Sequence, residues 1–168
     1  AEVREVDSAS SPQDWPEVDF CYVDPARRDR AGRKVAGIAD CEPDLSALQE
    51  VIRQKAGLCM VKLSPMLDVK SALDTLEHVA EVHAVSVCGE CKELLLVQTR
   101  CRPDGLVFHC VDLGNRDSDY SFTPEEEAKA PCVYADGPGR FLYEPHASVM
   151  KCGGFRSLAC RYGLRKLH

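Results

Sequence analysis

One short stretch near the start of the chain, DFCYVDPARRDR, places an acid, a proline and a cluster of three arginines after an apolar run. Pro25 holds Asp24 in extended geometry and removes a backbone donor. The Asp24 carboxylate and the nearby carbonyls then form a rigid edge of hydrogen-bond acceptors. Such an edge suits a neutral donor such as the amino group of a base, whereas Arg27 and Arg28 suit phosphates. These residue types therefore predict a site that binds a nucleotide-like group.

An ordinary strand end followed by a solvated loop is the other interpretation of this stretch. Aspartate followed by proline is a common way to end a strand, and charged residues are common in loops. The loop from Ala26 to Glu42 is 17 residues long, however, and structureless loops of that length in compact domains are usually functional or mobile. The length of the loop favours the functional interpretation.

Two further strand ends carry polar residues. Ser64 follows the apolar run 58–63, and Glu90 follows the run 82–87. In open α/β sheets, ligands bind beyond the carboxyl ends of the parallel strands, where loops and helix N-termini converge. Ser64 and Glu90 are therefore expected to line the same face as Asp24 and to bind substrate together with the two arginines.

Hydrophobic spacing predicts strands that alternate with helices, which is typical of the α/β class with a parallel sheet and right-handed crossovers. The gap between the strands 82–87 and 93–100 is too short for a crossover, so that pair is predicted to be antiparallel. Asp44 and Asp68 are the expected helix caps, and Gly57 is the expected end of the first helix. The expected strands cover 20–23, 58–63, 82–87, 93–100 and 105–113, and the expected helices lie within 42–57 and 68–82.

The last part of the chain reads as a separate small module. After a turn-rich stretch with one short helix, opened by a capping box from Thr123 to Glu126, we predict a boundary that divides 1–136 from 137–168. The module reads as two short helices split by Gly153-Gly154.

The module also differs from the rest of the chain in charge. Residues 140–168 carry six Lys and Arg against one acid, or +5, whereas residues 1–139 carry 15 against 26, or −11. A basic module on an acidic body favours a polyanionic partner. The residues predicted to contact such a partner are Lys151, Arg156, Arg161, Arg165 and Lys166.

Composition excludes several classes of protein. With 168 residues and 45% hydrophobic content, the chain can form a core of its own. No apolar run of about 18 residues is present, and the opening AEVREVDSAS lacks the basic and apolar regions of a secretion signal. The expected compartment is therefore the cytoplasm, with no membrane partner.

Ten cysteines invite three interpretations. Most lie inside apolar runs, which favours small buried hydrophobic residues over a disulfide framework. Cys88 and Cys91 form a C-x-x-C pair that Cys101, His109 or Cys110 could complete as a zinc site, although no second pair stands at knuckle spacing, and we predict no metal. Cys41, in DCEP, is a weaker candidate for a nucleophile.

Five segments together carry a family resemblance. YVDPARRD, IADCEPDL, VKLSPMLDV, EVHAVSVCGECKELLLV and FLYEPHASVMKCGGF resemble the class I S-adenosylmethionine-dependent methyltransferases that carry a C-terminal THUMP-like domain, over roughly residues 18–168. The resemblance implies part of a Rossmann-like sheet, with parallel strands and a C-terminal antiparallel strand, plus a small C-terminal α or α+β module. It also places the family's D/N-P-P-like motif on Asp24-Pro25-Ala26-Arg27, which makes Asp24 and Pro25 the catalytic residues that orient the methyl acceptor.

The chain departs from the family in one important respect. The family holds its cofactor with a glycine-rich loop after the first strand and an acid after the second, and this sequence contains neither. The resemblance therefore implies the second half of a methyltransferase that acts on RNA, either tRNA or rRNA. We expect these 168 residues alone to bind S-adenosylmethionine weakly or not at all and to be inactive. The alternative is a non-catalytic RNA-binding module on an α/β scaffold.

Overall fold

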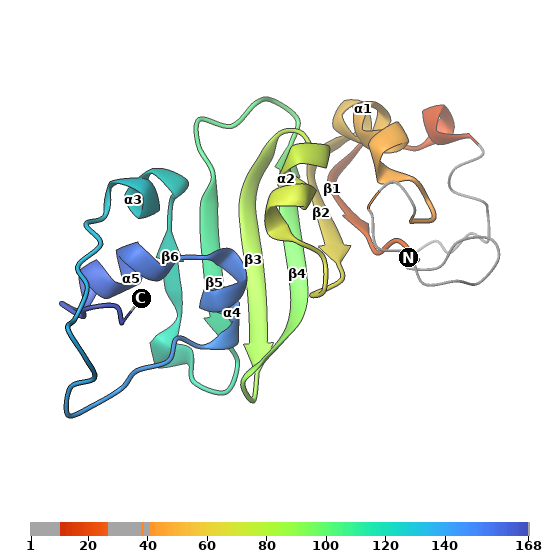
Figure 1. The fold of residues 1–168 in the computed structure, drawn as a ribbon. Helices are drawn as coiled ribbons and strands as arrows, with labels where there is room; N and C mark the ends of the chain where they lie inside the picture. The colour runs from red at the N-terminus through yellow and green to blue at the C-terminus, as the bar shows by residue number, and fades with distance from the viewer. Residues whose placement is uncertain (1–10, 27–37, 39–40, 168) are drawn as a thin grey trace. The chain divides into compact units, whose positions relative to one another are not determined.

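The computed structural model describes residues 11–26, 38 and 41–167 and has a mixed α/β fold (Figure 1). Six strands form one sheet in the order β1-β2-β4-β3-β5-β6. Strand β1 is parallel to β2, β3 is parallel to β5, and β5 is antiparallel to β6. The predicted α/β class is confirmed. The strands are β1 (Val18–Val23), β2 (Ala56–Leu63), β3 (Val79–Val87), β4 (Glu90–Thr99), β5 (Val107–Asp112) and β6 (Tyr120–Phe122).

The strands β3 and β4 are joined by two residues, Cys88 and Gly89 (Figure 1). Both have positive φ, 52° and 80°, as in the tight turns that connect antiparallel strands. The two strands are neighbours in the sheet, so the predicted antiparallel pair is confirmed.

The chain divides into two compact units, which are described separately. The first unit holds Ala1–Ala80 and Leu96–Pro103, and the second holds Glu81–Leu95 and Asp104–His168. The predicted division into 1–136 and 137–168 stays a prediction. None of the helices in the described part of the chain has the length and apolar character that crossing a membrane requires.

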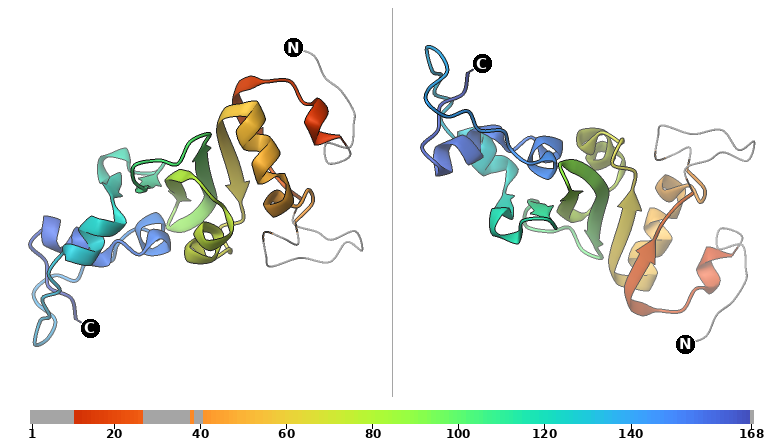
Figure 2. Two further views of the ribbon diagram at one scale, coloured as in Figure 1. Left: turned by 90° about the horizontal axis from the view of Figure 1, so that it is seen from above. Right: turned by 90° about the horizontal axis from the view of Figure 1, so that it is seen from below.

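In the first unit, helix α1 (Leu45–Lys55) packs along β2 (Figure 2). Its apolar face buries Leu45 and Ile52, and the Asp44 side chain accepts a hydrogen bond from the Ser46 backbone N–H at 2.9 Å, as the cap prediction required. The helix ends before Gly57, however, and Gly57 lies inside β2.

The prediction that Gly57 ends the helix is therefore wrong, and packing explains why glycine occupies this position. A Cβ on Gly57 would lie 3.0 Å from the backbone oxygen of Asp19 on β1. The glycine allows β1 and β2 to approach each other.

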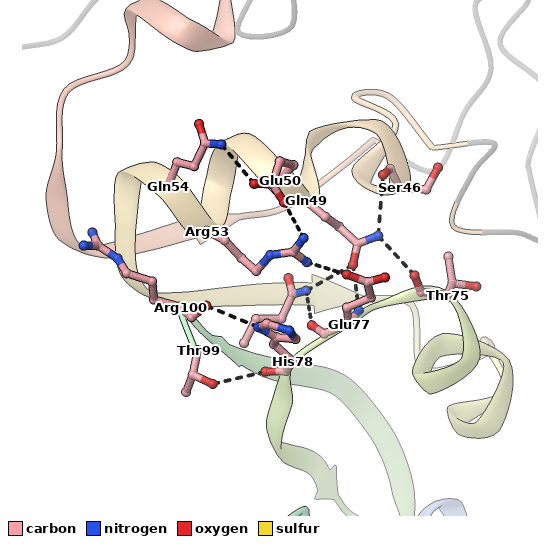
Figure 3. A network of polar contacts seen from close by, with 11 residues as sticks. Ser46, Gln49, Glu50, Arg53, Gln54, Thr75, Glu77, His78, Thr99 and Arg100 are labelled. Carbon is pink, nitrogen blue, oxygen red and sulfur yellow. Dashed lines mark hydrogen bonds and ion pairs between the residues drawn. The ribbon is translucent and has the colours of Figure 1, made fainter. Parts of the chain in front are cut away.

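Helix α2 (Val69–Thr75) is shorter than the sequence predicts, and side-chain amides account for its end (Figure 3). The Glu77 backbone N–H donates to Oε1 of Gln49 on α1 at 2.7 Å, and the Glu77 carbonyl accepts from Nε2 of Gln98 on β4 at 2.7 Å. The Gln49 amide also donates to the Thr75 carbonyl at 3.1 Å. These bonds take the places of helical hydrogen bonds and direct the chain into β3, three residues earlier than predicted.

In the second unit, helix α4 (Ala147–Cys152) packs on β5 and shares a buried polar contact with the sheet. The hydroxyls of Ser86 and Ser148 both donate to the Val111 carbonyl, at 3.2 and 3.1 Å, and lie 3.3 Å from each other. The two serines are fully buried, so these bonds satisfy polar groups that water cannot reach.

Helix α3 (Pro124–Lys129) begins with the predicted capping box between Thr123 and Glu126, which is confirmed. The Glu127 carboxylate of this helix accepts hydrogen bonds from the backbone N–H groups of Arg156 and Ser157, both at 2.8 Å. It thereby satisfies donors at the start of helix α5 (Phe155–Arg161).

The split of the C-terminal helices at Gly153-Gly154 is also confirmed. Gly153 ends α4 with φ of 76°, in the left-handed region that favours glycine. Gly154 has a different role, because a Cβ there would lie 2.5 Å from the nearest ring carbon of Phe122 on β6. Strand β6 was not predicted, because the alternation of apolar and polar residues over only three positions is too short to be recognised as a strand.

The substitution Gly154→Ala is expected to lower the free energy of unfolding by about 2 kcal/mol, because overpacking a core has a cost of this order. Phe122 is only 3% exposed and stacks on Phe108 and Tyr120, so its ring cannot move aside freely. Urea denaturation measures the change. The control is Gly137→Ala, where the Cβ meets no atom within 4 Å. Equal unfolding midpoints for the two variants would contradict the expectation.

Candidate functional site

Asp24 and Ser64 lie at the same edge of the first unit, since they follow the carboxyl ends of the parallel pair β1 and β2. The Asp24 Oδ2 atom lies 3.0 Å from Nζ of Lys62, and the Asp24 side chain is 47% exposed. Pro25 is buried beside it. An exposed ion pair contributes little to stability, so the main effect of Lys62 is to orient the carboxylate. Asp24 is accessible to a ligand and is held in place.

Ser64 is engaged in a turn. Its Oγ accepts a hydrogen bond from the Met66 backbone N–H at 3.2 Å, and its carbonyl accepts one from the Leu67 N–H at 3.0 Å. Its predicted contact with substrate stays a prediction.

The other predicted substrate contacts are Glu90, Arg27 and Arg28. Glu90 belongs to the second unit, where its exposed carboxylate pairs with Lys92. Arg27 and Arg28 lie outside the described residues. The base of the loop that carries the arginines is described, because Ala26 and Glu42 exchange two backbone hydrogen bonds, at 2.8 and 3.2 Å.

The predicted RNA contacts all belong to the second unit. Arg156 and Arg165 are exposed, and Lys151 is half-buried. The Arg161 guanidinium lies 5.2 Å from the centre of the Tyr120 ring, and Lys166 Nζ lies 5.7 Å from that of Phe155. Both contacts are within cation–π range, so these cations are partly positioned by aromatic rings.

An open groove of ≈ 580 Å³ in the second unit is lined by Arg161 and Tyr120, but by none of the other predicted RNA contacts. Its lining mixes charges, because Glu125 and Glu126 of α3 face it together with Lys129 and Arg161. Ser121, Ser157 and Cys160 also line it. A groove of this mixed character does not by itself select an anion.

The sequence-based cysteine interpretations have different outcomes. All ten cysteines are free thiols. The hydrophobic interpretation holds for the three that are buried, Cys41, Cys59 and Cys110, whereas the other seven are half-buried or exposed. Cys88 lies exposed in the β3–β4 turn, and Cys91 donates to the Glu93 carbonyl at 3.7 Å. Cys41 is 8% exposed, which disfavours a nucleophile that a substrate must reach.

Within the described residues, the grouping that suits a metal ion is a different one, made of Glu81, His83 and His109 in the second unit. Burial and the neighbouring His83 lower the pKa of His109, which favours its neutral form. The sequence analysis considered His109 only as a partner of the cysteines. The sequence does place Glu81 and His83 on one face of a strand, which could have suggested a pair of metal ligands. That His109 lies next to them follows only from the register of β3 and β5.

Cys21 on β1 is the thiol whose surroundings most favour the reactive thiolate form. It is the register partner of Cys59 on β2. A hydrogen bond with Cys59 lowers the pKa of the Cys21 thiol to about 7, against the opposing effect of burial, and the same contact raises the pKa of Cys59. The contact therefore favours the thiolate of Cys21 and the protonated form of Cys59.

Alkylation of Cys21 by iodoacetamide is accordingly expected to rise with a midpoint near pH 7, below the ordinary cysteine value of about 8.5. In Cys59→Ala the thiol donor is lost, so the midpoint is expected to move up toward the ordinary value. Peptide mapping by mass spectrometry at a series of pH values measures both. A Cys21 midpoint that is the same with and without Cys59 would contradict the assignment.

Comparison with known proteins places this geometry in context. A crystal structure described as "putative methyltransferase from Porphyromonas gingivalis W83" matches with 39% sequence identity and a TM-score of 0.77 over 89% of this chain. The chain spans 37% of the length of that protein. A family model described as a ferredoxin-like domain matches residues 141–168. No curated protein matches the sequence. In sequence and fold, this chain is thus similar to one part of a larger protein described as a methyltransferase, and its last residues are similar to a ferredoxin-like domain.

Proposed function

We propose that this chain is the part of an S-adenosylmethionine-dependent methyltransferase that positions the methyl acceptor, and that the acceptor is RNA. The observation that carries the proposal is the match to the P. gingivalis protein at 39% identity over 89% of the chain. The strand-end Asp24-Pro25 pair supports it, since an exposed carboxylate held by Lys62 suits a hydrogen-bond donor on the acceptor.

S-adenosylmethionine would supply the methyl group, and the strand ends in the described part of this chain do not offer the cradle for it. In the first unit, the parallel strands β1 and β2 end in Asp24-Pro25 and Ser64-Pro65. Prolines and a carboxylate do not provide the free backbone N–H groups of a glycine-rich loop. We therefore propose that another part of the complete protein holds the cofactor, and that this chain orients the acceptor.

The RNA assignment rests on charge. Residues 140–168 carry a charge of +5; Arg156 and Arg165 are exposed in the second unit, and Arg161 and Lys166 lie over aromatic rings. Aromatic and cationic groups together suit stacked bases and phosphates. The same residues favour the second candidate, a non-catalytic RNA-binding module with a THUMP-like C-terminal part.

The test compares the complete protein with this 168-residue chain, using labelled S-adenosylmethionine and total tRNA and rRNA. We expect labelled RNA with the complete protein and none with the chain alone. Transfer by the chain alone would contradict the proposed division of roles. RNA binding that weakens steeply with salt, with no transfer by the complete protein, would favour the non-catalytic module.

A further inference from the structure

We propose that Glu81, His83 and His109 form a binding site for a divalent transition metal ion, with Zn²⁺ as the expected ion. All three residues belong to the second unit, and their potential ligand atoms lie within 4.8 Å of one another. Imidazole nitrogens and a carboxylate oxygen are ligands that Zn²⁺ accepts, and sites with three protein ligands leave a fourth position open. The inference is independent of the proposed methyl transfer.

The sheet register brings the three side chains to one face. His83 on β3 is paired with His109 on β5, and Glu81 stands two residues before His83 on the same strand. Paired residues of neighbouring strands, and alternate residues of one strand, project on the same side. The two imidazole rings accordingly stack with centroids 4.6 Å apart, and Glu81 Oε2 lies 2.7 Å from His83 Nε2.

This face is accessible from solvent. The intervening residues Val82 and Ala84 are fully buried, as is Ser86, whose hydroxyl contacts α4 on the opposite face of the sheet. The side chains of His83 and Glu81, by contrast, are 27% and 44% exposed. An ion could reach the three ligands without opening the core.

A neighbouring residue orients one ligand. Ser121 is the register partner of His109 on β6, and its Oγ lies 2.8 Å from His109 Nδ1. A hydrogen bond at Nδ1 leaves Nε2 to coordinate a metal and fixes the plane of the ring, which is the usual arrangement around metal-bound histidines. Ser121 is thus a positioning residue and His109 a ligand.

The distances require only a small adjustment, which widens the closest pair of ligand atoms and draws the others together. Two bonds of about 2.1 Å at the tetrahedral angle hold ligand atoms about 3.4 Å apart. The Glu81–His83 contact is already shorter than this, and the largest separation in the group is at most 4.8 Å. Rotation of the partly exposed Glu81 and His83 side chains can make both changes.

The experiment titrates Zn²⁺ into the 168-residue chain by calorimetry after the exposed thiols have been blocked with N-ethylmaleimide, since free cysteines also bind zinc. We expect one ion per chain, and a loss of affinity of at least about tenfold in His83→Ala and in His109→Ala. Glu81→Gln is expected to weaken binding in the same direction. Ser121→Ala is expected to lower affinity about tenfold while leaving one ion bound.

His78→Asn is the matched control. His78 lies in the first unit, where its Nδ1 contacts the Arg100 carbonyl, and its φ of 56° is one that asparagine accepts. Its replacement should leave zinc affinity unchanged. Unfolding midpoints measured without metal establish that each variant is folded.

A second measurement needs no variant. In NMR spectra of the unsubstituted chain, Zn²⁺ is expected to shift the ring resonances of His83 and His109 but not those of His78. The proposal is overturned if the thiol-blocked chain binds no zinc, if zinc binding persists unchanged in the His83→Ala and His109→Ala double variant, or if the two ring signals do not respond.

Discussion

Replacing Asp24 by alanine in the complete protein is expected to lower methyl transfer to RNA by about 100-fold or more, with RNA affinity unchanged. Asp24 presents a half-exposed carboxylate at the end of β1, held by Lys62 at 3.0 Å. Under the proposed function, that carboxylate orients the methyl acceptor, and the loss of one orienting group has an effect of this size. Single-turnover transfer and filter binding measure the two quantities separately.

Two further variants make the Asp24 result specific. Asp74→Ala removes the same charge from an exposed position on α2 and should leave transfer unchanged. Lys62→Met keeps the carboxylate but removes its partner, so transfer should fall by less than in Asp24→Ala. If Asp24→Ala lowered RNA affinity and transfer equally, the carboxylate would be part of general RNA binding and not of acceptor positioning.

Replacing Gln49 by leucine is expected to lower the free energy of unfolding by about 3 kcal/mol, since a buried donor or acceptor left without a partner costs about 1–3 kcal/mol. Gln49 is 9% exposed, and its amide satisfies both the Glu77 N–H and the Thr75 carbonyl (Figure 3). Leucine has a similar volume, so the loss would come from hydrogen bonds and not from a cavity. Urea denaturation with a fixed m-value measures it.

The matched control for Gln49 lies on the same helix. Gln54 is exposed and bonds only to the Glu50 side chain, at 2.9 Å, among the hydrogen bonds described for it. Gln54→Leu is therefore expected to change stability by less than about 0.5 kcal/mol. A similar loss in the two variants would mean that helix propensity, and not the buried amide contacts, determines the effect.

Local features of this fold could be predicted from the sequence because neighbouring residues determine them. The Asp44 and Asp68 caps, the capping box at Thr123 and the split at Gly153-Gly154 each depend on a few consecutive side chains. The edge that carries Asp24 could also be predicted, since apolar runs that alternate with helices imply parallel strands.

Features that depend on distant residues could not be predicted. The end of α2 depends on amides of Gln49 and Gln98, and the presence of glycine at position 57 depends on Asp19 of the neighbouring strand. The grouping of His83 with His109 depends on the strand register across β3 and β5, which no periodicity within either strand reveals. For the same reason, the sequence suggested cysteine partners for His109 and not Glu81.

The bridge between Ala26 and Glu42 bears on how the sequence of this protein can evolve. The two backbone hydrogen bonds fasten the points where the chain leaves β1 and returns toward α1. The bridge therefore fixes the two ends of the intervening segment next to Asp24 and Pro25, and the entropy of closing such a segment depends only weakly on its length. Selection could therefore alter the length of this segment at little entropic cost while the bridge that closes it stays constant.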